Sequence, residues 1–189
     1  CYLHALTPAM VHGDLKPDNV LVDGTTQKTK LIDFGLSQLQ KRNWKGHMGG
    51  STRWMAPEIL VKKSSWPAPD AATDIFSFGR VAFFTVTALL PLQDTNHEFL
   101  FSQAELGLVP ELQWSEAAVE LPLLEKCREL CERCLAFEAV MRPTALELLL
   151  DLERWPREDQ DQEESSKFRP LKDALKSFKQ AEAEHKMAL

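Results

Sequence analysis

The sequence has no excess of basic residues, few cysteines and no long uninterrupted apolar run. Its 22 Lys and Arg residues are outnumbered by 28 Asp and Glu residues, which gives a formal net charge of −6. Nucleic-acid-binding proteins usually carry a basic surface, so this balance argues against a nucleic-acid partner. The four cysteines have irregular spacing that does not suggest the framework of a secreted disulfide-rich domain, which favours a reducing compartment.

The longest apolar stretch, residues 75–92, is too interrupted to cross a membrane. Arg80, Ser77 and two threonines divide it, whereas a bilayer span needs about 20 mostly apolar residues. A buried helix of a globular core is therefore the expectation. No signal peptide is recognisable, so we expect a cytoplasmic protein. The chain starts at Cys1 rather than at a methionine, and a fragment of a longer protein is the simplest interpretation.

The most informative stretch is residues 11–19. It contains an acid, Asp14, a cation, Lys16, and a carboxamide, Asn19, within six residues. Pro17 favours a stiff loop over a helix. A carboxylate can accept a hydroxyl proton, a lysine can hold phosphate charge, and an asparagine oxygen suits Mg²⁺. With a second acid at Asp33, fourteen residues after Asn19, the sequence has the groups that phosphoryl transfer requires.

Two short strands are predicted between these acids. Residues 20–22 and 30–32 are mostly β-branched and leucine residues, and Asp23-Gly24 is a turn signal between them. Pairing of the two strands would carry Asn19 and Asp33 to neighbouring positions. A shared metal site requires such an arrangement.

Three motifs, in the same order, resemble those of eukaryotic protein kinases. They are His12-Gly13-Asp14-Leu15-Lys16-Pro17-Asp18-Asn19 for the catalytic loop, Asp33-Phe34-Gly35 for the metal-binding turn, and Ala56-Pro57-Glu58 for the end of the activation segment. Residues 15–17 resemble the serine/threonine class, and residues 50–58 resemble its tyrosine-kinase-like branch. The resemblance covers about residues 2–155. It implies a mainly α fold with short β hairpins, namely the C-terminal lobe of a kinase domain without its N-terminal lobe.

This resemblance implies the roles of the catalytic and metal-binding residues. Asp14 takes the proton of a serine or threonine hydroxyl on a protein substrate, and Lys16 holds the transferring phosphate of ATP. Asn19 and Asp33 hold Mg²⁺. His12 supports the site by packing rather than by reacting.

Further site residues follow from the same resemblance. Leu21 lies beneath the adenine ring, although an ordinary core strand explains this residue equally well. Phe34 supports the site by packing rather than by reacting, and Gly35 completes the turn that opens the activation segment. Ser51 falls where the family usually has a threonine that contacts the catalytic acid and lysine, and it keeps the hydroxyl.

Two long-range contacts are also implied. Glu58, after Ala56 and Pro57, resembles a glutamate buried against a distant arginine, which matches Arg142 here; we expect this pair to be structural. Asp74 resembles a residue that holds the catalytic loop through backbone N–H groups near His12. A plain helix-terminal carboxylate is the alternative for Asp74.

The spacing of Cys127, Cys131 and Cys134 fits two different structures. Their spacing matches an iron–sulfur signature, but it also places them at i, i+4 and i+7 of a predicted helix over residues 121–135. A cluster needs thiolates that converge from a loop, whereas buried helical cysteines behave as small hydrophobic residues. We therefore expect these cysteines to belong to the core.

Two departures from the family pattern matter. Gly13 stands where most kinases have an arginine that pairs with a phosphorylated activation segment, so switching by that phosphate is expected to be weak or absent. The glycine-rich loop, strand lysine and helix glutamate of the N-terminal lobe have no counterpart here, so the chain alone should be nearly inactive. The alternative function is a truncated or pseudokinase-like lobe that acts as a protein-binding module.

The predicted domain ends near residue 155. A last helix is expected over residues 144–155, with Leu146, Leu149, Leu150 and Leu152 on its apolar face. Residues 156–189 are expected to be a charged, disordered tail. Leu171, Leu175 and Phe178 recur at helical spacing there, so a short amphipathic helix that docks on the lobe or on a partner is the alternative to a solvated tail.

Overall fold

The structure, a computed structural model, describes residues 1–26, 28–39, 52–61, 69–114 and 122–155. Within these ranges lie the α-helices α1 (Pro57–Leu60), α2 (Ala71–Thr87), α3 (His97–Glu105), α4 (Pro122–Cys134) and α5 (Ala145–Glu153). The strands are β1 (Met10–Val11), β2 (Val20–Val22), β3 (Thr29–Leu31) and β4 (Gln38–Leu39). Short 3₁₀ helices include η1 (Leu3–Ala5), η2 (Pro17–Asn19), η3 (Phe34–Leu36), η4 (Thr52–Trp54) and η6 (Ala139–Met141). The prediction of a mainly helical fold with short β structure is confirmed.

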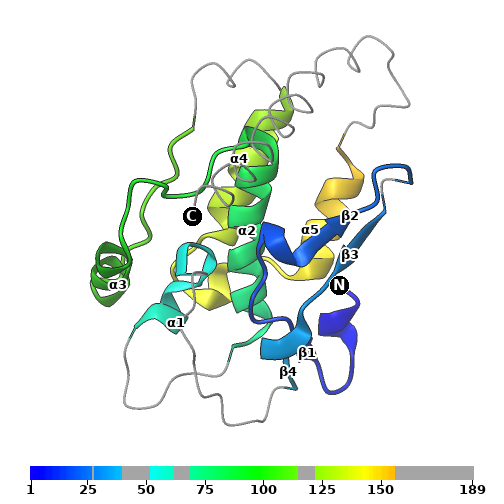
Figure 1. Cartoon of the computed structure of the whole chain (residues 1–189), viewed down its shortest axis with the longest axis horizontal. Coiled ribbons are helices and arrows are strands. Elements are labelled where there is room, and N and C mark those ends of the chain that lie inside the picture. Colours follow the sequence, from blue (N-terminus) through cyan, green and yellow to red (C-terminus); the bar gives the residue numbers. More distant parts are fainter. Residues whose placement is uncertain (27, 40–51, 62–68, 115–121, 156–189) are drawn as a thin grey trace, which may run out of the picture.

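Helix α2 runs through the middle of the fold, with α4 beside it and the strands at one side (Figure 1). Asp70 caps its N-terminus in a reciprocal capping box with Thr73. Ala88 ends the helix in the left-handed conformation, at φ 57°. The buried residues of α2 include Ile75, Phe76 and Phe83. Residues 75–87 of the apolar run thus belong to a core helix, whereas residues 88–92 follow its end. No helix in the described ranges is long and apolar enough to span a membrane.

Helix α4 packs closely along α2. The predicted helix over residues 121–135 is confirmed, and Leu124, Cys127, Leu130, Cys131 and Cys134 are buried on one face. Cys127 and Cys131 contact Phe83 of α2 in one core cluster, and Cys134 lies with Ile75 in another. The spacing of three and four residues gives this face because it matches the helical repeat.

The two helices approach most closely at Gly79. A β-carbon at this position would lie 2.7 Å from Cys134 Cβ, an atom that cannot rotate away. We therefore expect Gly79→Ala to lower the free energy of unfolding by about 1–3 kcal/mol, although alanine favours helix formation. Chemical denaturation measures the change. Gly24→Ala is the control, because its β-carbon meets nothing within 4 Å. Equal stability of both variants would show that the helices are not in close contact.

The predicted apolar face of the last helix is wrong at three of its four leucines, and only Leu152 packs against the core as expected. Thr144 caps α5 in a capping box with Glu147, but the buried leucine is Leu148. The side chains expected in the core, Leu146, Leu149 and Leu150, are all more than a third exposed. Leu148 points inward because it joins the cluster of Ile75, Leu130 and Cys134, with Leu152 one turn later.

The strands form two antiparallel pairs. In the predicted hairpin, Val20 lies opposite Leu31, and the second strand begins one residue earlier than expected. The pairing of β1 with β4, Met10 opposite Leu39, was not predicted. This second pair brings the chain after the β2–β3 hairpin back to the start of the loop over residues 12–19. The predicted tail over residues 156–189 lies outside the described residues.

Candidate active site

The loop between β1 and β2 brings two predicted site residues, Lys16 and Asn19, to the carboxylate of a third, Asp14. Lys16 Nζ lies 2.7 Å from Asp14 Oδ2. Asn19 Nδ2 donates to the same oxygen at 3.2 Å and to the Asp14 backbone carbonyl at 2.7 Å. Pro17 begins the 3₁₀ helix η2, which turns the chain so that Asn19 lies beside Asp14. The prediction of a loop rather than an α-helix is confirmed.

Asp74 fixes this loop to the N-terminal end of α2. Its Oδ2 accepts a hydrogen bond from His12 N at 2.8 Å, and its Oδ1 accepts one from Gly13 N at 2.9 Å. Gly13 has φ 77°, a left-handed conformation that glycine adopts readily. Two successive N–H groups thereby reach one buried carboxylate. His4 Nε2 also lies 2.9 Å from Asp74 Oδ2; sequence reasoning missed this residue, since no motif marks it.

His12 is a buried support of the loop. The Asp14 N–H donates to His12 Nδ1 at 3.3 Å, so Nε2 carries the proton and donates to the Ile32 carbonyl at 3.0 Å. The Phe34 ring lies 5.1 Å from the imidazole, centroid to centroid. His12 therefore joins the loop over residues 12–19 to the end of the β2–β3 hairpin.

The hairpin places Asn19 and Asp33 at the same end. The Ile32 N–H donates to the Asn19 carbonyl at 3.0 Å, next to the paired strands. Asp33 has φ 57°, and its Oδ1 accepts a hydrogen bond from Gly35 N at 3.2 Å. The left-handed conformation turns the chain away from the strand, so the Asp33 carboxylate lies at the exposed surface.

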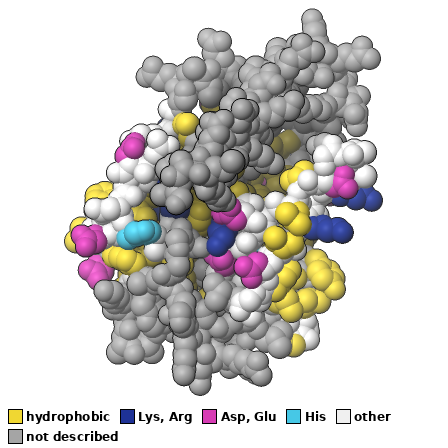
Figure 2. Space-filling view, in the orientation of Figure 1, with side chains coloured by type: hydrophobic (Ala, Val, Ile, Leu, Met, Phe, Trp, Pro, Cys, Tyr) yellow, Lys and Arg dark blue, Asp and Glu magenta, His cyan; other side chains and the backbone are white. Residues whose placement is uncertain are grey.

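An apolar surface surrounds this end of the hairpin. The side chains that are more than a third exposed there are Leu21, Val22, Leu31, Ile32 and Phe34. In the orientation of Figure 1, hydrophobic side chains gather at the right of the visible face, beside a small group of acidic and basic side chains (Figure 2). Large contiguous apolar patches on a protein surface mark binding sites.

The end of the predicted activation segment is tied to the core through Glu58. Arg142 Nη1 and Nη2 donate to Glu58 Oε1 and Oε2, each at 2.7 Å. The Arg142 side chain is fully buried, and Ala56 and Pro57, just before Glu58, are buried as well. The expected pair is thus present across 84 positions of sequence. Ser51 lies outside the described residues.

Helix α2 also holds the 3₁₀ helix η4. Ser77 Oγ donates to the Trp54 carbonyl at 2.8 Å, and Arg80 Nη1 donates to the Arg53 carbonyl. Arg80 is buried, and its guanidinium lies 4.6 Å from the Phe76 ring centroid. Burial, with a smaller contribution from the charge of Arg53, lowers the pKa of Arg80 to about 9. Sequence reasoning treated Arg80 only as an interruption of an apolar run.

The cysteines of α4 are core residues. Cys131 Sγ donates to the Gly79 carbonyl at 3.2 Å, and burial raises the pKa of the Cys134 thiol to about 12. A cluster requires thiolates, so this environment opposes the iron–sulfur alternative. Among the described residues, no group of three or more His, Cys, Asp or Glu side chains could hold a metal ion.

Residues 1–152 match the protein kinase domain family. The chain belongs to this family. It is 34% identical over 151 residues to a probable serine/threonine-protein kinase WNK10 of Arabidopsis thaliana, covering 79% of this chain and 26% of that protein. It is 34% identical over 153 residues to receptor-interacting serine/threonine-protein kinase 3 of Rattus norvegicus, covering 76% of this chain and 31% of that protein. Serine/threonine/tyrosine-protein kinase HT1 of Arabidopsis thaliana is 37% identical over 129 residues, covering 67% of this chain and 31% of that protein.

The matched range includes the loop over residues 12–19 and the turn at Asp33. The chain spans about a quarter to a third of the length of these three relatives. Two of these relatives are named as serine/threonine kinases and one as a serine/threonine/tyrosine kinase.

Proposed function

We propose that the chain is the C-terminal lobe of a serine/threonine protein kinase, similar to the tyrosine-kinase-like branch. As part of a longer kinase it transfers the terminal phosphate of ATP to serine or threonine hydroxyls of protein substrates. The observation that carries this proposal is the convergence of Lys16 and Asn19 on the Asp14 carboxylate. The cytoplasmic location and the absence of a nucleic-acid partner remain predictions.

Asp14 and Lys16 divide the chemistry between them. Among the described residues, Lys16 and Asn19 engage Asp14 through Oδ2, and Oδ1 would orient the substrate hydroxyl and accept its proton. The Lys16 ammonium is beside this carboxylate and only 21% exposed, where its charge can stabilise the transferring phosphate. His12 and Asp74 take no part in the transfer, and they hold the backbone of the loop in place.

Asn19 and Asp33 fit a magnesium site. The Asn19 amide donates through Nδ2 to Asp14, so its Oδ1 remains for a cation. Protein Mg²⁺ sites typically use one or two carboxylates together with substrate phosphates. Asn19 and Asp33 would therefore hold Mg²⁺, which would neutralise charge on the ATP phosphates.

The exposed apolar surface of the hairpin supports a nucleotide site. Leu21 is 53% exposed and Phe34 42% exposed, beside the loop that bears Asp14. In the proposed kinase the adenine ring lies against Leu21, and an N-terminal lobe covers the surface and supplies the glycine-rich loop and the strand lysine. The chain by itself therefore binds ATP poorly.

Nucleotide binding tests the metal site directly. We expect Asp33→Asn or Asn19→Ala, in the chain extended by an N-terminal lobe, to lower Mg²⁺-dependent ATP affinity by at least about tenfold, because even indirect partners of metal ligands have effects of that size. Titration calorimetry with and without Mg²⁺ measures the affinity. Asp23→Asn is the control, since Asp23 lies on the same hairpin but bonds only to its own turn. Equal affinity of all variants would exclude the metal site and favour a non-catalytic binding module.

A further inference from the structure

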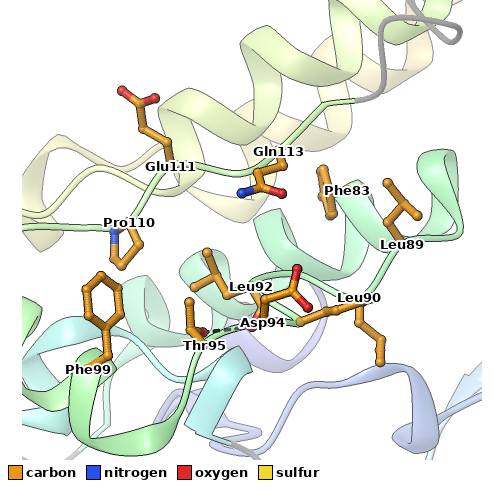
Figure 3. Close-up of a pocket in the computed structure, with 11 residues that line it drawn as sticks. Phe83, Leu89, Leu90, Leu92, Asp94, Thr95, Phe99, Pro110, Glu111 and Gln113 are labelled. Atoms are coloured by element: carbon orange, nitrogen blue, oxygen red, sulfur yellow. Dashed lines mark hydrogen bonds between the residues drawn. The ribbon is translucent and has the colours of Figure 1, made fainter.

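A groove lies at the C-terminal end of α2, away from the Asp14 loop. It has a volume of about 310 Å³. One wall is the segment after α2, with Leu89, Leu92 and Asp94, and the other wall is residues 110–113. In Figure 3, Asp94 and Gln113 point into the space between these walls, and Phe83 lines it between Gln113 and Leu89. Nine residues of α2 separate Asp74 from Phe83, about 14 Å along the helix axis.

The groove combines apolar and acidic surface. Leu89 is 41% exposed and Phe99, at one end, is 43% exposed. Asp94 and Glu111 are exposed acids on its lining. In the part of the chain that the structure describes, neither acid forms an ion pair. A ligand that fits such a surface has basic side chains interleaved with apolar ones.

Residues 167–179 of the same chain have this composition. Lys167, Arg169, Lys172, Lys176 and Lys179 are opposed by a single acid, Asp173. Leu171, Leu175 and Phe178 recur at helical spacing, each followed directly by a lysine. Residues 158–164, by contrast, contain five acids and no base. Charge complementarity therefore selects residues 167–179 of the tail and rejects residues 158–164.

The chain between Trp155 and Leu171 is long enough for residues 167–179 to reach the groove. Trp155, the last described residue, packs in the same core cluster as Phe83, which lines the groove. Leu171 lies sixteen positions after Trp155, and sixteen residue steps span more than about 50 Å when extended. Two segments linked within one chain can meet at an effective concentration of the order of millimolar, so a weak contact suffices.

We propose that residues 167–179 dock into this groove of their own chain, with Leu171, Leu175 and Phe178 against its apolar walls and the lysines beside Asp94 and Glu111. The groove is then a binding site for a basic amphipathic segment. Because it lies apart from the Asp14 loop, this docking does not depend on kinase activity.

Hydrogen exchange of the full chain tests the proposal. With a Kd near 0.1 mM and an effective concentration near 1 mM, amides in residues 171–178 should exchange about tenfold more slowly than unprotected peptide. Asp94→Lys with Glu111→Lys should remove this protection, and added Lys172→Glu with Lys176→Glu should restore it. Glu125→Lys with Glu129→Lys on α4 is the control, because it makes the same charge change at exposed positions elsewhere.

Several results overturn the proposal. Unprotected exchange of residues 171–178 in the wild-type chain excludes docking. Protection that persists in the groove variant, or that coincides with protection of the exposed leucines of α5, places the segment elsewhere. Protection that rises with protein concentration shows that the segment occupies a second copy. Circular dichroism and the thermal midpoint establish that the variants are folded.

Discussion

Replacing Arg142 with methionine is expected to lower the free energy of unfolding by roughly 3–5 kcal/mol. Arg142 uses all five of its N–H donors. Two donate to Glu58, and the other three donate to the carbonyls of Ala72, Ala136 and Phe137. Methionine preserves much of the volume but leaves the Glu58 carboxylate and three carbonyls without these donors. Denaturant titration measures the loss.

Arg133→Met provides the matched control. Arg133 donates to Asp151 at 2.7 Å, the same distance as in the Arg142 pair, but its side chain is 49% exposed. Solvent screening limits such a pair to under about 1 kcal/mol. The double variant Glu58→Gln with Arg142→Met should lose less free energy of unfolding than the two single variants lose together, because the two partners share one interaction. Similar small losses for Arg133 and Arg142 would contradict the structural role of the buried pair.

The second large effect is expected at Asp14. In the proposed extended kinase, Asp14→Asn should lower the rate of phosphate transfer by about 10²–10⁴-fold, the usual contribution of a general base. Asparagine retains the shape and can still accept from Lys16 and Asn19 through Oδ1, but it cannot take the hydroxyl proton. ATP affinity should therefore change little. Single-turnover kinetics separates the two quantities.

Asp18→Asn is the control for this variant. Asp18 lies in the same loop and has the same chemistry, but it is exposed and does not contact Asp14 through any hydrogen bond seen among the described residues. We expect its transfer rate to stay within about twofold of the wild type. A comparable loss in Asp14→Asn and Asp18→Asn would attribute the effect to loop charge rather than to proton transfer.

The sequence was most predictive where interacting residues are close in the chain. Asp14, Lys16 and Asn19 lie within six positions, and Pro17 limits the conformations that join them. The two strands of the hairpin were also predictable, because β-branched residues flank a turn signal. The contacts of Asp74 with the loop and of Arg142 with Glu58 span 62 and 84 positions. Only the resemblance to protein kinases, not local chemistry, indicated them.

Other features had no signal in the sequence. β1 and β4 have two residues each, too few for an alternating pattern. His4 reaches Asp74 through tertiary packing alone. The buried face of α5 was mispredicted because leucines occupy most of the helix, so that periodicity cannot decide which of them turn inward. Leu148 is selected by the position of α5 against α2 and α4.

The environment of Arg80 could not be predicted from the sequence either. A charged residue in an apolar run usually indicates exposure, yet Arg80 is among the most buried side chains. Its Nη1 reaches the Arg53 carbonyl and its guanidinium stacks on Phe76, while Nε has no hydrogen-bond partner among the described residues. This arrangement depends on the position of η4 against α2, which no local pattern specifies.

The most direct test of the proposed function is Mg²⁺-dependent transfer of labelled terminal phosphate from ATP to a serine- and threonine-containing protein such as casein. The chain as given and the chain extended by its N-terminal lobe are compared under the same conditions. We predict label on serine or threonine with the extended chain and almost none with the chain alone. An extended chain that transfers no label and binds no ATP would contradict the proposal and would leave a protein-binding module as the function.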